Sequence, residues 1–184
     1  MRLLAVSVLA LCVAAGPALA SEDKQDADWT GVQLGVLYGY SWMQDYNNTL
    51  RLHAEGDGDV MGVYAAANKQ FGALVGGVEV SYARHDNMFT DGSGVVVENV
   101  FAAKLRAGVA RDRVHIYGTA GLTHGTTNLA GDDWGAVFGF GLDVLLTRSI
   151  VAGAQYNYYT YTNFNDTTID AQLSELSFRL GYKF

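Results

Sequence analysis

The sequence has almost no cysteine and almost no proline. Its only cysteine, Cys12, and its only proline, Pro17, both lie within the first twenty of its 184 residues. The rest of the chain therefore has no disulfide framework, and no proline interrupts a ladder of β-strand hydrogen bonds there. After these twenty residues no apolar run approaches 18 residues, so no membrane-spanning α-helix is expected. No segment of that part shows a convincing helical period either.

Basic residues are also scarce. The chain has 12 Lys and Arg against 19 Asp and Glu, a formal net charge of −7. This balance argues against a nucleic-acid partner, which requires a basic face. Several acids fall in stretches that we expect to be loops or directly beside them, namely Asp45, Glu55, Asp57, Asp59, Asp132 and Asp133. We interpret them as a solvated negative surface that binds divalent cations weakly at most.

The first twenty residues have the form of a secretory leader. Arg2 precedes an apolar run from Leu3 to Ala15, and Ala18-Leu19-Ala20 has the small-x-small form of a signal-peptidase site. The pattern predicts a cleaved signal peptide over residues 1–20 and export through the general secretory route. Residues 21–28 are then a polar lead-in, and residues 29–184 form one domain.

The remaining chain alternates between two kinds of side chain. At its end, Leu176, Phe178, Leu180, Tyr182 and Phe184 occupy every second position, with small or cationic residues between them. Alternation with a period of two predicts a β-strand that has two different faces.

The same alternation predicts eight strands. They cover residues 29–42, 59–68, 73–84, 95–110, 114–124, 134–146, 150–161 and 173–184. Four long connections, at 43–58, 85–94, 125–133 and 161–170, alternate with three short turns. The order predicts an all-β fold, an eight-stranded antiparallel up-and-down barrel.

Size decides which face of the strands points inward. The bulky face carries thirteen large aromatic side chains, and an eight-stranded barrel is only just wide enough for its own side chains. A soluble lipocalin-like barrel, with the bulky face inside, is therefore disfavoured. Bulky residues facing lipid make the fold a transmembrane β-barrel. An aromatic girdle of Trp29, Tyr40, Trp42, Tyr82, Trp134 and Tyr158 is expected near the strand ends.

The opposite face carries charges of both signs. Glu79, Lys104, Arg106, Asp143 and Arg179 would lie in a narrow lumen, where an unpaired charge is costly. We expect these five residues to form an ion-pair network that plugs the lumen and leaves little or no pore activity. The alternative interpretation is a gated ion path.

No residues suggest a catalytic or metal site. His53, His85, His115 and His124 lack the spacing of metal ligands, and no Ser-His-Glu spacing suggests a deacylase. We therefore expect no catalytic residues, no metal and no cofactor. An enzyme that modifies lipid A or another envelope lipid remains the alternative function.

Several short motifs resemble those of one family. They are Trp29-Thr30-Gly31, Asn68-Lys69-Gln70-Phe71-Gly72, Gly77-Val78-Glu79, Lys104-Leu105-Arg106-Ala107-Gly108, Tyr117-Gly118-Thr119-Ala120-Gly121, Gly139-Phe140-Gly141-Leu142-Asp143 and Leu180-Gly181-Tyr182-Lys183-Phe184. In this order they resemble the small outer-membrane β-barrel proteins of the opacity-protein and OmpA-like superfamily. The porin-annotated members of alphaproteobacterial type are the most similar.

The resemblance implies location in the outer membrane of a Gram-negative bacterium, in contact with lipid and lipopolysaccharide. It implies that Leu180, Tyr182 and Phe184 form the C-terminal signal for the barrel-assembly machinery, with periplasmic chaperones as earlier partners. It also implies a non-enzymatic role in envelope integrity, with surface loops that are candidates for adhesion or for binding an extracellular ligand.

Overall fold

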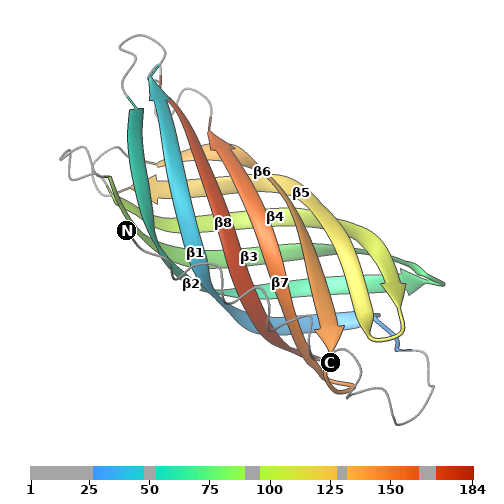
Figure 1. Ribbon diagram of the computed structural model, residues 1–184. Coiled ribbons are helices and arrows are strands. Elements are labelled where there is room, and N and C mark those ends of the chain that lie inside the picture. The colour runs from blue at the N-terminus through green and yellow to red at the C-terminus, as the bar shows by residue number, and fades with distance from the viewer. Residues whose placement is uncertain (1–26, 48–52, 90–95, 128–131, 162–168) are drawn as a thin grey trace.

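The computed structural model describes residues 27–47, 53–89, 96–127, 132–161 and 169–184. These residues form β1 (Gly31–Asn47), β2 (His53–Phe71), β3 (Leu74–Phe89), β4 (Val96–Arg111), β5 (Val114–Thr127), β6 (Asp132–Leu145), β7 (Ile150–Tyr161) and β8 (Ile169–Lys183). All neighbouring strands are antiparallel, and β8 also pairs with β1, so the sheet closes into a barrel (Figure 1). The predicted fold class is confirmed. The predicted signal peptide and residues 21–26 of the lead-in lie outside the described residues.

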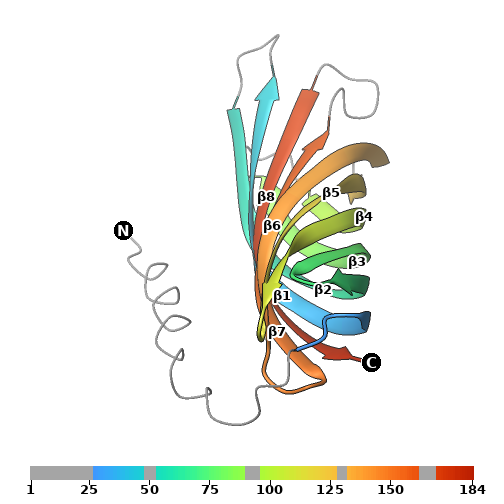
Figure 2. The ribbon, with the colours of Figure 1, turned by 90° about the vertical axis from the view of Figure 1, so that its right-hand side faces the viewer.

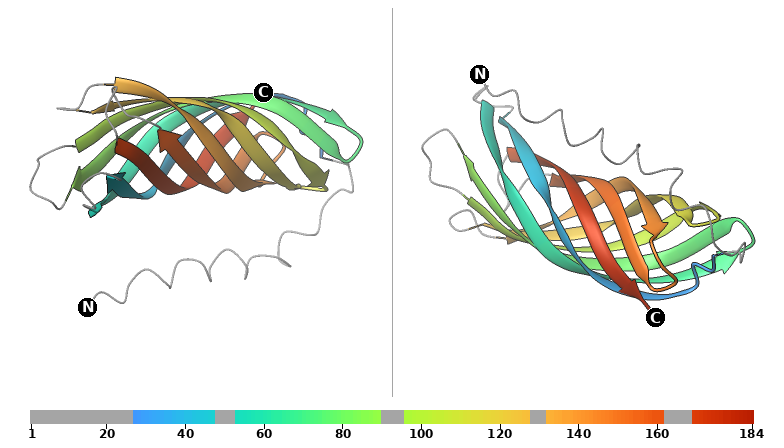
Figure 3. Two further views of the ribbon diagram at one scale, coloured as in Figure 1. Left: turned by 90° about the horizontal axis from the view of Figure 1, so that it is seen from above. Right: turned by 60° about the horizontal axis from the view of Figure 1, so that its bottom comes forward.

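Closure of the barrel removes both free edges of the sheet. The β1–β8 ladder runs from Gln33 opposite Lys183 to Asn47 opposite Ile169. Each strand therefore has a hydrogen-bonded neighbour on both sides, and no edge is left to pair with another chain. The strands wrap around the barrel in one tilted layer (Figures 2 and 3). Of the described residues, no helix is long and apolar enough to cross a membrane.

Several strands extend further than the alternation predicts. The pairing of β1 with β2 continues to Tyr46 opposite His53, and β3 continues to Phe89. The predicted loops at 43–58 and 85–94 are therefore too long, and His85 is a strand residue. In these extensions the backbone ladder continues although the sequence no longer alternates between apolar and polar side chains. By contrast, β7 has the predicted bounds.

The outer surface is apolar and the lumen is polar at mid-height. Side chains such as Val36, Leu105 and Phe140 are 56%, 68% and 65% exposed on the outside of the barrel. The two neighbours of Leu105 on the opposite face, Lys104 and Arg106, are buried. This is the reverse of a soluble barrel, in which the bulky apolar side chains fill the interior.

Apolar clusters lie in the lumen on either side of its polar middle. At the short-turn end, Trp29 packs with Val75, Ala110, Leu145 and Val151. At the other end the cluster consists of Met43, Val100, Ala102, Val137, Tyr159, Tyr161 and Leu173. These two clusters lie between the polar middle of the lumen and the two ends of the barrel.

The prediction that Trp29 belongs to the lipid-facing girdle is wrong. Its side chain is fully buried, and its ring lies 5.1 Å from the ring of His115. The chain bends at Gly31, where φ is 138°, a value that L side chains rarely adopt. The Trp29 amide donates to Gln70 Oε1 at 2.7 Å, which holds the entering chain across the mouth of the barrel.

The entry to β1 is also fixed by a local turn. Asp28 Oδ1 accepts a 2.8 Å hydrogen bond from the amide of Thr30. This backbone hydrogen bond stabilises the carboxylate and lowers the pKa of Asp28 below its ordinary value, and the nearby charges of Lys183 and Lys69 act in the same direction. The arrangement directs the chain from the lead-in toward the barrel wall.

Candidate functional site

The five charged residues predicted for the lumen lie there together. Glu79 is on β3, Lys104 and Arg106 are on β4, Asp143 is on β6 and Arg179 is on β8, and each is at most 3% exposed. They come from four strands spread around the barrel, and all occupy the positions that alternate with the lipid-facing residues. Their side chains meet at mid-height in the lumen.

Glu79 is the centre of this network. Its Oε1 lies 2.7 Å from Lys104 Nζ, and its Oε2 lies 3.1 Å from Arg106 Nη1 and 2.8 Å from Arg179 Nη2. One buried carboxylate thus faces three cations. Burial makes each of these charges costly by itself, and their mutual attraction in a region of low dielectric offsets that cost.

Asp143 closes the network on the other side of Arg106. Arg106 Nη2 donates to Asp143 Oδ2 at 2.7 Å, and the Tyr117 hydroxyl donates to Asp143 Oδ1 at 3.3 Å. Arg179 Nη1 in turn donates to the Tyr117 oxygen at 3.0 Å. The two arginines are therefore connected through both Glu79 and Tyr117.

Two tyrosine rings support the two guanidinium groups. The Arg106 guanidinium carbon lies 3.9 Å from the centre of the Tyr117 ring, and that of Arg179 lies 3.8 Å from the centre of the Tyr64 ring. Such cation–π contacts gain strength where water is excluded. They also fix the planes of the guanidinium groups, so that each arginine can bridge two partners.

A second buried carboxylate cluster was not predicted from the sequence. Glu175 Oε2 lies 3.3 Å from His85 Nε2 and accepts a 3.0 Å hydrogen bond from the Tyr159 hydroxyl. Asn157 donates to Glu175 Oε1 at 3.4 Å, and Lys104 Nζ lies 3.5 Å from the Asn157 oxygen. The cluster therefore continues the Glu79 network toward the loop end.

The charges of the described lumen residues balance. Three carboxylates, Glu79, Asp143 and Glu175, face three cations, Lys104, Arg106 and Arg179. Glu175 lies four positions before Arg179 on β8, so the alternation places both side chains on the lumen face. His85 lacked any such signal because the sequence around it does not alternate.

The three histidines whose side chains the structure describes do not lie together. His85 and His115 are both fully buried but lie in different clusters, and His124 pairs with Asp132 at 2.9 Å on the outer surface. In the part of the chain that the structure describes, no group of three or more His, Cys, Asp or Glu side chains could hold a metal ion. The His85–Glu175 pair joins an imidazole to a carboxylate, and both side chains are at most 1% exposed.

Most of the predicted girdle residues lie on the outer surface. Tyr40, Trp42, Tyr82 and Trp134 are between 39% and 61% exposed, and Tyr158 is partly exposed. The predicted assembly-signal residues Leu180, Tyr182 and Phe184 are also exposed, and the rings of Tyr182 and Phe184 lie 4.8 Å apart. Both sets of side chains therefore face the surroundings of the barrel.

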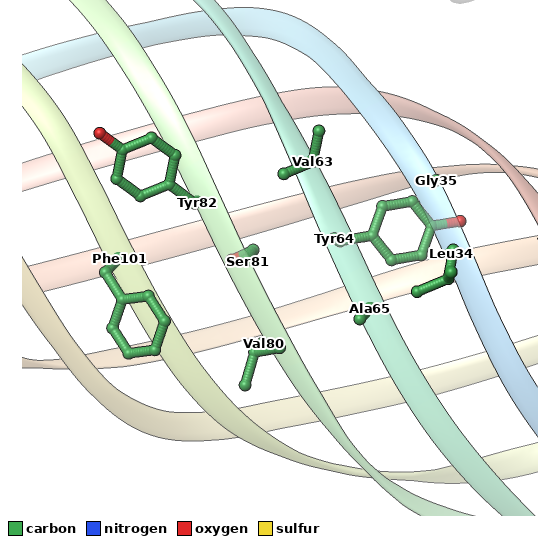
Figure 4. A pocket seen from close by; sticks show the side chains of 9 residues that line it. All are labelled: Leu34, Gly35, Val63, Tyr64, Ala65, Val80, Ser81, Tyr82 and Phe101. Carbon is green, nitrogen blue, oxygen red and sulfur yellow. The ribbon is translucent and has the colours of Figure 1, made fainter.

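The outer wall also has a shallow apolar groove of about 350 Å³ across β1 to β4 (Figure 4). Its walls include Leu34 from β1, Val80 and Tyr82 from β3, and Phe101 from β4, with the small Ala65 of β2 between them. The groove lies on the apolar outer surface and not in the lumen.

Comparison with known families identifies the type of barrel. Residues 5–184 match the model of the outer membrane protein beta-barrel domain. The chain belongs to this family. Members of this family are outer-membrane barrels, so the apolar outer surface described above faces lipid and the short turns face the periplasm.

Solved outer-membrane β-barrels are similar in fold. Ail, the attachment invasion locus protein of Yersinia pestis, is 18% identical, with a TM-score of 0.46 over 84% of this chain and 99% of that one. Neisserial surface protein A (NspA) is 16% identical, with a TM-score of 0.49 over 82% and 97% of the two chains. OprG of Pseudomonas aeruginosa is 13% identical, with a TM-score of 0.48 over 88% and 99%. No curated protein matched the sequence.

Proposed function

We propose that this outer-membrane β-barrel is a non-enzymatic envelope protein whose lumen is closed and whose loops present a binding surface outside the cell. Its contribution to the envelope is structural, and adhesion is the function proposed for the loops. The observation that carries the proposal is the balanced set of six charged side chains at mid-height in the lumen, with apolar clusters on both sides.

A permeating ion would have to displace these contacts. It would pass Trp29 and its apolar neighbours, enter the network and separate Glu79 from three cations. Separating buried, hydrogen-bonded ion pairs costs several kcal/mol per uncompensated charge. The closed lumen therefore favours a structural role over transport.

Planar-bilayer recording tests the closed lumen. Purified protein is expected to give no frequent, defined channel openings. The Glu79→Ala/Arg179→Ala double variant removes the centre of the network and should raise conductance if it still folds. Defined openings by the unmodified protein would contradict the proposal. If the double variant folds and shows no more conductance than the unmodified protein, the apolar clusters alone close the lumen.

A deletion strain tests the envelope and loop roles separately. Loss of the protein is expected to increase detergent sensitivity and to reduce adhesion to host cells or matrix. Complementation with a variant in which residues 48–52 are replaced by glycine and serine should restore detergent resistance. Restoration of both properties by this variant would exclude residues 48–52 as the adhesive segment.

Lipid A analysis addresses the enzymatic alternative. The His85–Glu175 pair is buried in the lumen, which gives a lipid substrate no access to it. Mass spectrometry of lipid A from the deletion strain should show the same species as the parent. A species that disappears on deletion and returns on complementation would support an enzyme instead.

The proposed export and assembly route depends on both ends of the chain. Residues 1–20 would direct secretion, and the exposed Leu180, Tyr182 and Phe184 would be recognised by the assembly machinery. Deletion of Phe184 should reduce the amount of folded barrel in the outer-membrane fraction, measured by gel mobility with and without boiling. Normal insertion of this variant would contradict the assembly role.

A further inference from the structure

Three arginines gather at the periplasmic end of β4 to β7. Arg111 ends β4, Arg113 precedes β5, and Arg148 lies in the turn between β6 and β7. All three are exposed. The two turns are connected, because the Leu145 amide donates to the Arg113 carbonyl at 2.9 Å and Arg113 Nη1 donates to the Leu146 carbonyl at 3.4 Å. The arginines thus belong to one surface, although they come from two hairpins.

This surface has a local excess of positive charge. Among the described side chains of the two turns, Asp112 is the only acid, and it occupies the tip of its turn with φ at 50°. The nearest lumen acid, Asp143, is fully buried and is paired with Arg106. The three arginines and the one aspartate give these two turns a formal net charge of +2.

Apolar side chains adjoin the arginines on the lipid-facing side. Val109 and Ile116 are 53% and 55% exposed, and they lie opposite each other on β4 and β5. Arg111 follows Val109 by two positions, so by strand alternation it continues the same face. A cationic group at the lower edge of an apolar band is placed where lipid headgroups meet acyl chains.

We propose that Arg111 and Arg113, with Arg148 beside them, bind the phosphate of an anionic phospholipid in the periplasmic leaflet of the outer membrane. Guanidinium groups present paired N–H donors that match phosphate oxygens. The acyl chains of the bound lipid would lie along Val109 and Ile116. The surface therefore has matching contacts for both parts of one amphipathic partner.

Among the described residues, two other cations lie at this end of the barrel, in different surroundings. Lys183 Nζ donates to the Thr30 carbonyl at 3.3 Å, and both Lys69 and Lys183 act electrostatically on Asp28. They carry the same number of positive charges as Arg111 and Arg113, but they lie on β2 and β8, near Asp28 at the entry to β1, and not in the two turns that carry the arginines. This difference provides a matched control.

The test compares two double variants in nanodiscs made of equimolar phosphatidylethanolamine and phosphatidylglycerol. After mild detergent extraction, native mass spectrometry measures the lipid that remains on the barrel. The unmodified protein should retain phosphatidylglycerol in preference to phosphatidylethanolamine. Arg111→Gln/Arg113→Gln should reduce this retention about tenfold or more, as expected for two cations near an anionic headgroup. Lys69→Gln/Lys183→Gln should leave it unchanged.

Three outcomes would overturn the proposal. Equal retention of the two lipids by the unmodified protein would show that the surface does not select an anionic headgroup. Equal losses of retained phosphatidylglycerol in both double variants would show that all cations at the periplasmic end attract the lipid non-specifically. Sedimentation with purified peptidoglycan that is lost only in Arg111→Gln/Arg113→Gln would identify a different partner. Heat-modifiable gel mobility shows that each variant is folded before the comparison.

Discussion

Replacement of Glu79 tests whether the lumen network stabilises the barrel. Glu79→Gln keeps the shape of the side chain but leaves Lys104, Arg106 and Arg179 without their shared carboxylate. Removing one partner from a buried ion pair costs about 3–5 kcal/mol because the remaining charge stays buried. The amide oxygen of glutamine can still accept a hydrogen bond from one cation, so we expect a loss near the lower limit, about 3 kcal/mol.

A second substitution separates this effect from a general defect. In Glu79→Gln/Lys104→Met one cation is removed together with the carboxylate, which restores the charge balance. Lys104 is the suitable partner because its other contacts, Gln155 and Asn157, are neutral. The double variant should be more stable than the sum of the two single losses predicts, by about 1–3 kcal/mol.

Urea unfolding of the refolded barrel in phospholipid vesicles gives these free energies. Tryptophan fluorescence follows unfolding, and gel mobility without boiling gives an independent measure of the folded fraction. Asp59→Asn is the control, since Asp59 is an exposed acid on β2 and its replacement should change stability by no more than about 0.5 kcal/mol. A loss below about 1 kcal/mol for Glu79→Gln, or strictly additive single losses, would refute the reasoning.

Three further substitutions test other parts of the structure, each by urea unfolding or gel mobility. Trp29→Ala should cost about 3–5 kcal/mol, because it leaves a cavity in the apolar cluster at the periplasmic end; a change below 1 kcal/mol would place Trp29 outside the barrel after all. Gly35→Val should abolish the folded band, since a Cβ there would lie 2.5 Å from the Tyr64 ring, whereas Gly76→Val, in open space, should fold normally. Leu105→Arg should cost about 2–4 kcal/mol in vesicles, as a cation on the lipid face does, and an unchanged stability would contradict the orientation of β4.

The alternation of side chains predicts most of this fold. A strand with lipid on one side and a narrow lumen on the other requires apolar side chains at every second position, so the alternation is strict. On β4, Lys104 and Arg106 flank Leu105, and burial of the two cations against 68% exposure of Leu105 follows that parity. The strand ends beyond the apolar band are not predictable in this way. In residues 43–47 and 53–58 backbone pairing continues although the apolar–polar alternation is lost, so only the backbone ladder shows that they belong to strands.

The membership of the lumen network is partly readable from sequence, but its connections are not. Their positions in the alternation identify Glu79 and Arg179 as lumen residues. Their contact, however, joins positions that are 100 residues apart in the sequence. Which lumen residues meet depends on strand tilt and on the stagger at closure, and neither quantity appears in the periodicity of a single strand. The same limit explains Trp29, whose burial depends on the bend at Gly31 and on the space between β3, β4, β6 and β7.

Closure of the barrel and completion of the network are one event. Arg179 lies on the last strand, and it bonds to Glu79 on β3 while its guanidinium stacks on the Tyr64 ring of β2. The Tyr64 side chain lies so close to Gly35 and Gly181 that a Cβ at either position, on β1 or on β8, would collide with it. Before β8 docks, Glu79 lacks one of its three cations and Tyr64 has no guanidinium above it. The lumen therefore favours the closed state over an open sheet, because only pairing of β8 with β1 brings Arg179 to the charges that it balances.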